Sequence, residues 1–173
     1  MPPSPQRAQP HRLPCPVVKK HKELHGLYFA SSSVEPVQTE VLTIFPPVEN
    51  SLSKRFPLFE TILGTMYPIH ECRVRVDGGG RHTQIDFLVA FQERPDLPPN
   101  AAISRLVPHA SVCAEIVVMR SGARYLVLDM GGHGPSEAAK RAVRKFILQY
   151  VAHHAQYRGK RRVPPLPTAI GFD

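Results

Sequence analysis

Residues 69–91 encode a β-hairpin and read IHECRVRVDGGGRHTQIDFLVAF. Apolar side chains fall on one face of each arm, because every second residue of a strand points to the same side. These positions are Cys72, Val74, Val76, Ile85, Phe87, Val89 and Phe91. Between the arms, Asp77-Gly78-Gly79-Gly80 supplies a turn, since glycine accepts the positive φ of tight hairpin turns.

Two further β-segments lie on either side of this hairpin. Residues 37–45 have the composition of a strand, with alternate side chains on its two faces, and Pro46-Pro47 ends the run. Residues 113–119 and 124–130 predict a second hairpin that turns at Ser121-Gly122.

Helical segments separate and follow the β-segments. The longest begins at Ser136, a favourable N-cap, continues with Glu137 in its first turn and can end at Gly159. Its apolar residues recur at three- and four-residue steps, at Ala139, Val143, Phe146, Ile147, Tyr150 and His154. Shorter helices are expected from Pro57 to Gly64 and over residues 101–107.

This order of elements predicts an α+β domain. We expect an antiparallel sheet of about five strands, made of one strand and two hairpins, with a long C-terminal helix and a shorter helix packed on one face. The expected organisation is a disordered, basic, proline-rich arm at residues 1–24, a single domain at 25–158 and a basic, proline-rich tail at 159–173.

Basic charge is concentrated at the two ends of the chain. The net formal charge is +8, with +4 over residues 1–30, −3 over 31–139 and +7 over 140–173. Basic segments attract polyanions, and they also keep solvated ends soluble. Both interpretations remain open from composition alone.

A basic surface is predicted on the last helix and the tail. Residues four apart share a helix face, so Lys140 with Arg144 and Arg141 with Lys145 form two adjacent rows. The full set predicted to contact a nucleic acid or another polyanion is Lys140, Arg141, Arg144, Lys145, Arg158, Lys160, Arg161 and Arg162. Such a surface binds phosphates without sequence preference and in a salt-dependent way. The alternative is the solvated outer face of an amphipathic helix.

The glycine-rich connection before the last helix is a second candidate site. Amide groups at a helix N-terminus can hold an anion, and the residues there are Gly132, His133, Gly134 and Ser136. The segment matches neither a P-loop nor a dinucleotide-binding fingerprint, and Pro135 lacks an amide donor. A tight connection that requires glycine is the competing interpretation.

Residues from about Val127 to Leu148 resemble the end of the double-stranded-RNA-binding domain. That family closes with a β-strand, a glycine-rich connection and a basic helix start followed by alanines. The matching residues are Gly132, Gly134, Ser136, Lys140 and Ala142. However, Glu137-Ala138-Ala139 stands where the family usually has lysines, and two separate hairpins precede the helix instead of a three-stranded sheet. The chain is therefore not assigned to that family.

No recognisable catalytic or metal-binding motif occurs in the sequence. Cys15, Cys72 and Cys113 have no CxxC spacing, and there is no HExxH or GxSxG. We therefore predict no catalytic residue, no metal and no cofactor, and leave open whether the protein is an enzyme. Asp129 ends a strand beside the glycines, where a turn-capping role is the common one.

Three functions follow from these features. The first is binding of RNA or DNA, or another polyanion, by the last helix and tail. The second is a protein-interaction or scaffold domain whose partner meets the sheet or the proline-rich ends, such as residues 163–167, without catalysis. The third is an enzyme with a site at residues 129–136. No apolar run reaches the length of a membrane span and no secretory signal is evident, so we expect an intracellular protein, cytoplasmic or nuclear. The oligomeric state is not predicted.

Overall fold

The fold is described from a computed structural model of the chain. It describes residues 21–44, 56–78, 83–122, 127–131 and 137–157.

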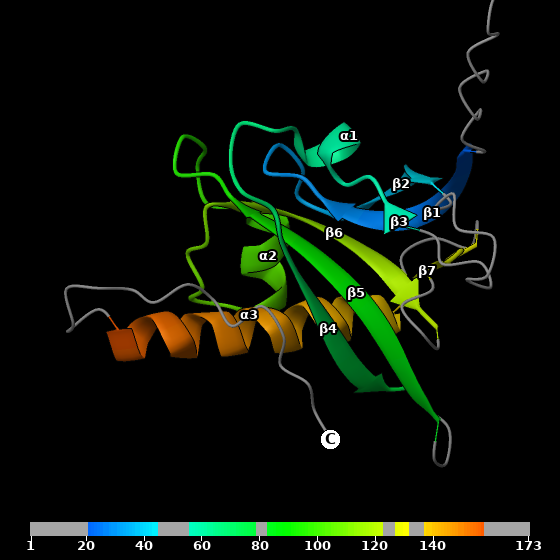
Figure 1. The fold of residues 1–173 in the computed structure, drawn as a ribbon. Coiled ribbons are helices and arrows are strands. Elements are labelled where there is room, and N and C mark those ends of the chain that lie inside the picture. The colour runs from blue at the N-terminus through cyan, green and yellow to red at the C-terminus, as the bar shows by residue number, and fades with distance from the viewer. Residues whose placement is uncertain (1–20, 45–55, 79–82, 123–126, 132–136, 158–173) are drawn as a thin grey trace, which may run out of the picture.

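The described residues form a seven-stranded antiparallel sheet that curls around itself (Figure 1). The strands are β1 (His21–Phe29), β2 (Val37–Ile44), β3 (Phe56–Pro57), β4 (His70–Asp77), β5 (Gln84–Glu93), β6 (Ala114–Ser121) and β7 (Val127–Leu128). Their spatial order is β3-β2-β1-β6-β5-β4, and β7 pairs with β6 beside this path. The strand that begins the described chain therefore lies in the middle of the sheet.

The hairpin read from residues 69–91 is confirmed. In β4 and β5, Val74 pairs with Phe87 and Cys72 with Val89, so the alternating apolar residues meet across the two strands. The second hairpin is confirmed where it is described, with Ser121 of β6 opposite Val127 of β7.

Strand β1 was not predicted, and it includes residues 21–24, which the sequence placed in the arm. It pairs with β2 over eight residues but with β6 only from Leu27 to Phe29. Gly26 marks the point where β1 leaves β6, because a Cβ there would lie 3.0 Å from the carbonyl oxygen of Val118. Beyond that point β7 takes the place of β1 along β6. The sheet therefore forks at Gly26.

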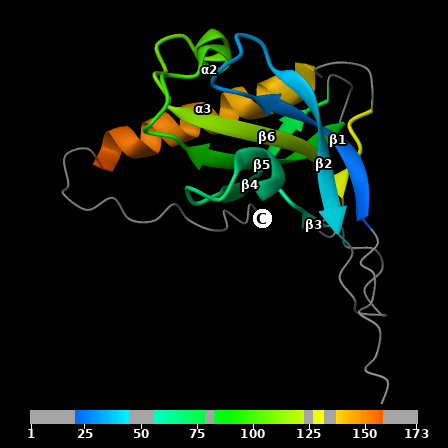
Figure 2. The same cartoon turned by 90° about the horizontal axis from the view of Figure 1, so that it is seen from above.

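The helices lie on both faces of the curled sheet (Figures 1 and 2). The long helix α3 (Glu137–Tyr157) and the short helix α2 (Ala101–Leu106) share one core with Phe29, Phe91 and Ile116. The helix α1 (Glu60–Leu63) is shorter than the segment predicted from Pro57, and Gly64 ends it at φ 77° as expected.

Helix α1 and the residue before it cover the opposite face. Phe59 and Leu63 join a second core that contains Leu24 of β1, Val41 of β2 and Met119 of β6. The curl of the sheet creates this second core, because β1 and β2 fold over the inner face and leave a space that the α1 side chains fill. The α+β class, the long C-terminal helix and a shorter helix on the same face, α2, are as predicted, while α1 lies on the opposite face.

Among the described residues, no helix has the combination of length and apolar composition needed to cross a lipid bilayer.

Candidate functional site

The four basic residues predicted on α3 lie on its outer side. The opposite side of the helix is buried in the core through Ala139, Ala142, Val143, Phe146 and Ile147. Arg141, Arg144 and Lys145 are exposed, whereas the Lys140 side chain is 24% exposed and pairs with Glu137 at 3.0 Å. The amphipathic pattern of the sequence therefore places these four cations as predicted.

Two of these cations reach the outer edge of β4, the strand at one end of the sheet. Arg141 Nη2 donates to the carbonyl oxygen of Asp77 at 2.9 Å, and Lys145 Nζ donates to that of Arg75 at 3.0 Å. These carbonyls face away from β5, so without α3 they would be open to pairing with another strand. Arg141 and Lys145 thus have a structural role that the sequence did not predict.

Strand β4 carries two further cations, on the face of the sheet opposite α3. Arg73 and Arg75 alternate with the core residues of β4 and so lie on the inner face of the sheet. Arg75 makes a two-pronged ion pair with Asp86 of β5, at 2.7 and 3.1 Å. The hydrogen bond from Arg75 holds the pKa of the Asp86 carboxyl below its usual value, against the opposing effect of burial.

We call the resulting surface the basic edge. It combines two residues of β4 with four of α3, and its members are Arg73, Arg75, Lys140, Arg141, Arg144 and Lys145. Asp86 and Glu137 offset part of its charge. Arg144 makes no hydrogen bond or ion pair with any described residue, so its guanidinium is the most available of the set for a ligand.

The other predicted site residues lie outside the described residues. These are Arg158, Lys160, Arg161 and Arg162 of the tail and Gly132, His133, Gly134 and Ser136 of the glycine-rich connection. Asp129, at the start of that connection, holds a turn. Its Oδ1 accepts hydrogen bonds from the backbone amides of His25 at 2.9 Å and Gly131 at 3.2 Å, and it lies 3.0 Å from His25 Nδ1.

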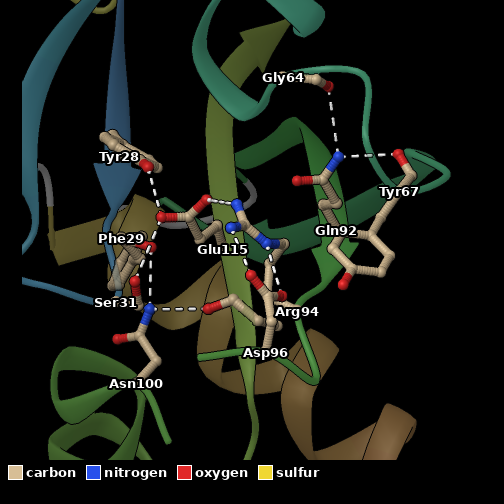
Figure 3. A network of polar contacts seen from close by, with 11 residues as sticks. Tyr28, Phe29, Ser31, Gly64, Tyr67, Gln92, Arg94, Asp96, Asn100 and Glu115 are labelled. Carbon is tan, nitrogen blue, oxygen red and sulfur yellow. Dashed lines mark hydrogen bonds and ion pairs between the residues drawn. The ribbon is translucent and has the colours of Figure 1, made fainter. Parts of the chain in front are cut away.

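A polar network on the inner side of the sheet was missed by the sequence analysis (Figure 3). Glu115 is buried and accepts hydrogen bonds from the Tyr28 hydroxyl at 2.7 Å and from Arg94 Nη1 at 3.1 Å. Arg94 also binds both carboxylate oxygens of Asp96, at 2.8 and 3.0 Å. Burial and then the bond to Glu115 raise the pKa of Tyr28, so its phenol stays a proton donor. The network ties β1 and β6 to the segment that follows β5.

The side chain of Asn100 lies beside this network and is fully buried. Its Nδ2 donates to the carbonyl oxygens of Phe29 and Ala114, both at 2.9 Å, and its Oδ1 accepts from the amide of Ile103 at 3.1 Å. The last contact caps α2. A lone Asn before a short helix was the only available sequence signal, and it does not reveal the two strand contacts.

The described residues contain no group of three or more His, Cys, Asp or Glu side chains able to hold a metal ion. Burial raises the pKa of the Cys72 thiol to about 12, which suits the small apolar role expected of it.

Comparisons with protein-family models, curated proteins and solved structures found no match to this chain. The described strand order, with β1 between β2 and β6, also differs from the three-stranded sheet of the double-stranded-RNA-binding domain.

Proposed function

We propose that the protein binds a polyanion, with RNA or DNA as the favoured ligand, along the basic edge. The observation that carries the proposal is the contact of α3 with β4, in which Lys145 Nζ donates to the backbone carbonyl oxygen of Arg75 at 3.0 Å and Arg141 Nη2 to that of Asp77 at 2.9 Å. These contacts place the α3 cations along the outer edge of β4, whose other face carries Arg73 and Arg75, so cations from segments about 70 residues apart flank one edge of the sheet. A cluster drawn from two elements is a better phosphate-binding surface than one helix row, because it can meet successive phosphates of a backbone.

The residues of the basic edge would have different roles in binding a phosphate backbone. Arg144 is free to pair with a phosphate, and a guanidinium suits two phosphate oxygens at once. Lys145 uses one of its three ammonium protons on the carbonyl of Arg75 and keeps the others for a ligand. The α3 contact with β4 holds Arg141 and Lys145 in place before binding, which reduces the entropy lost on association.

This mode of binding is electrostatic and independent of sequence. Each neutralised phosphate of a DNA duplex contributes about −0.9 to the slope of log affinity against log salt concentration. Two contacts, from Arg144 and Lys145, predict a slope of about −1.8 from the basic edge alone, because Arg75 is engaged by Asp86. A nucleic-acid ligand also fits a protein located inside the cell, in the cytoplasm or nucleus.

The test is fluorescence anisotropy of labelled RNA and DNA duplexes with the full-length chain, over a range of about 50 to 200 mM salt. Arg144→Gln removes the unpaired cation of the basic edge. Lys22→Gln removes one exposed cation from β1 and is the matched control for net charge. We expect Arg144→Gln to reduce the slope by about 0.9 and Lys22→Gln to leave it nearly unchanged.

The contribution of the tail is separated with a full-length variant in which Lys160, Arg161 and Arg162 are glutamine. Binding by this variant that still depends on Arg144 supports the basic edge. Equal affinities for Arg144→Gln and Lys22→Gln, or binding lost wholly in the tail variant, would reject the basic edge as the site.

A second candidate function is a protein-interaction domain without catalytic activity. One observation favours it: Leu148 is 51% exposed and Val151 39% exposed on the surface of α3, just beyond Arg144. This alternative predicts a protein partner whose binding changes little with salt and is lost in Leu148→Ser. An enzyme site at residues 129–136 gains no such support, since only residues 129–131 of that stretch are described.

A further inference from the structure

A pocket of about 500 Å³ lies at the other end of α3 from the basic edge. It is an open pocket lined by the last turns of α3, the end of β5 and the segment from His109 to Cys113 that leads into β6. This volume is within the range of small-ligand sites, roughly 300 to 1,000 Å³. The pocket shares no residue with the basic edge.

The wall formed by residues 109–113 is held by hydrogen bonds to its neighbours. The carbonyl of Val112 accepts from the amide of Asn100 at 2.9 Å, and that of Cys113 accepts from the amide of Arg94 at 2.8 Å. His109 has a φ of 74°, a left-handed conformation that is uncommon outside glycine. Residues held in such conformations occur often at ligand sites, where the surrounding structure fixes them.

A carboxylate and two rings face this pocket. Glu93 Oε1 accepts a hydrogen bond of 2.6 Å from the Tyr150 hydroxyl. The ring of His154 lies 4.2 Å from that of Tyr150, centroid to centroid. His154 Nε2 lies 3.8 Å from Glu93 Oε1, which is too far for a hydrogen bond. Burial, and then the bond to Glu93, raise the pKa of Tyr150, so the phenol remains a donor that fixes the carboxylate.

The negative charge of Glu93 has no lysine or arginine partner among the residues that line the pocket. The neighbouring Arg94 is engaged by Asp96 and Glu115 on the inner side of the sheet. Glu93 Oε2 makes no hydrogen bond to any described residue, and the side chain is 49% exposed. The pocket therefore presents a positioned anion beside aromatic rings, with apolar walls from Pro95, Val112 and Val151.

We propose that this pocket binds an alkyl-ammonium or alkyl-guanidinium group. The cation would pair with Glu93 and lie against the rings of Tyr150 and His154, and its alkyl stem would lie on the apolar walls. Cations are attracted to both carboxylates and aromatic faces, and the attraction grows as water is removed. Such a group occurs on free amines and on the lysine and arginine side chains of proteins.

The test is a two-dimensional amide NMR titration of the full-length chain with butylamine, butylguanidine and 1-butanol, which has the same stem and no charge. We expect saturable shifts at Glu93, residues 109–113 and residues 150–154 with the two cations only. In Glu93→Gln the affinity should fall at least about tenfold, as for loss of a charge-assisted hydrogen bond. Glu40→Gln, at an exposed carboxylate on β2, is the matched control and should bind as the parent does.

Additional measurements distinguish the source of the cation and show whether a loss of binding comes from misfolding. Tighter binding of a blocked lysine or arginine amide than of the free amines points to a protein side chain, and the reverse order points to a small amine. Tyr150→Phe keeps the ring and the charge but frees the carboxylate, so it should weaken binding less than Glu93→Gln. Absence of saturable shifts with either cation, equal binding of 1-butanol, or unchanged affinity in a folded Glu93→Gln would each overturn the proposal.

Discussion

Replacement of Asn100 by alanine should destabilise the protein strongly, although no charge and little volume are lost. The side chain makes three hydrogen bonds, to Phe29, Ala114 and Ile103, and all three partner residues are fully buried. A typical hydrogen bond contributes about 1 kcal/mol, and a buried group left unpaired costs about 1–3 kcal/mol. Three such losses predict about 3 kcal/mol at the lower end of the range. For a chain of this size that corresponds to a fall in Tm of about 6–12 °C.

The assay is urea unfolding followed by far-UV circular dichroism, because the chain contains no tryptophan. Thr61→Ala is the matched control, since it removes one exposed hydrogen bond, from Thr61 Oγ1 to the carbonyl of Leu58 at 2.7 Å. We expect the control to lose less than about 1 kcal/mol. A loss below about 1 kcal/mol for Asn100→Ala, with an unchanged dependence on urea, would refute the assigned role of Asn100.

Asn100→Asp tests the same contacts through the pH dependence of stability. The new carboxylate would face two carbonyl oxygens, so folding should raise its pKa above the unfolded value. Stability should therefore be highest below the unfolded pKa and fall as the pH rises through the folded pKa. A variant whose stability does not fall over that pH range would contradict the geometry.

Three further predictions concern the basic edge, the fork of the sheet and the buried thiol. Asp86→Asn should release Arg75 for phosphate, so the salt slope of duplex binding should steepen by about 0.9, which the anisotropy titration measures. Gly26→Ala should lower the free energy of unfolding in urea by about 1–3 kcal/mol, because the added Cβ would lie 3.0 Å from the backbone oxygen of Val118. An unchanged free energy of unfolding would show that β1 and β6 can move apart at Gly26. Cys72 should resist alkylation in the native protein at pH 8 and react in urea, since its thiol has a pKa of about 12, and peptide mass spectrometry distinguishes the two states.

The parts of the fold that were predictable depend on local patterns. The alternation in β4 and β5 sets which residues face the core, and the spacing of apolar residues in α3 sets its buried side. Strand β1 was missed because its residues 21–23, His-Lys-Glu, are polar and Gly26 interrupts the apolar pattern. Its place in the sheet depends on β6, which lies about 90 residues further along the chain. Local periodicity carries no information about such a pairing.

The candidate sites, like the fold, were predictable only where they depend on local sequence patterns. The basic rows of α3 follow from helical spacing, whereas the contact of Arg141 with Asp77 spans 64 residues and required the structure. No sequence motif indicates the pocket, because Glu93, His109 and Tyr150 come from three separate segments. A sequence pattern shows what one helix or strand presents, and a site shared among elements appears only when they pack together.

The central position of β1 has a consequence for how the protein is made. The contact between Tyr28 and Glu115 spans 87 residues, so β1 and β2 leave the ribosome long before β6 does. At a synthesis rate of about 5–20 residues per second, β1 waits roughly 4–17 s with one edge open. During that interval the nascent chain displays an unpaired strand, the kind of surface that chaperones recognise and that crowded chains exchange. Slow translation of residues 30–113 should therefore increase aggregation more than slow translation after β6 has emerged.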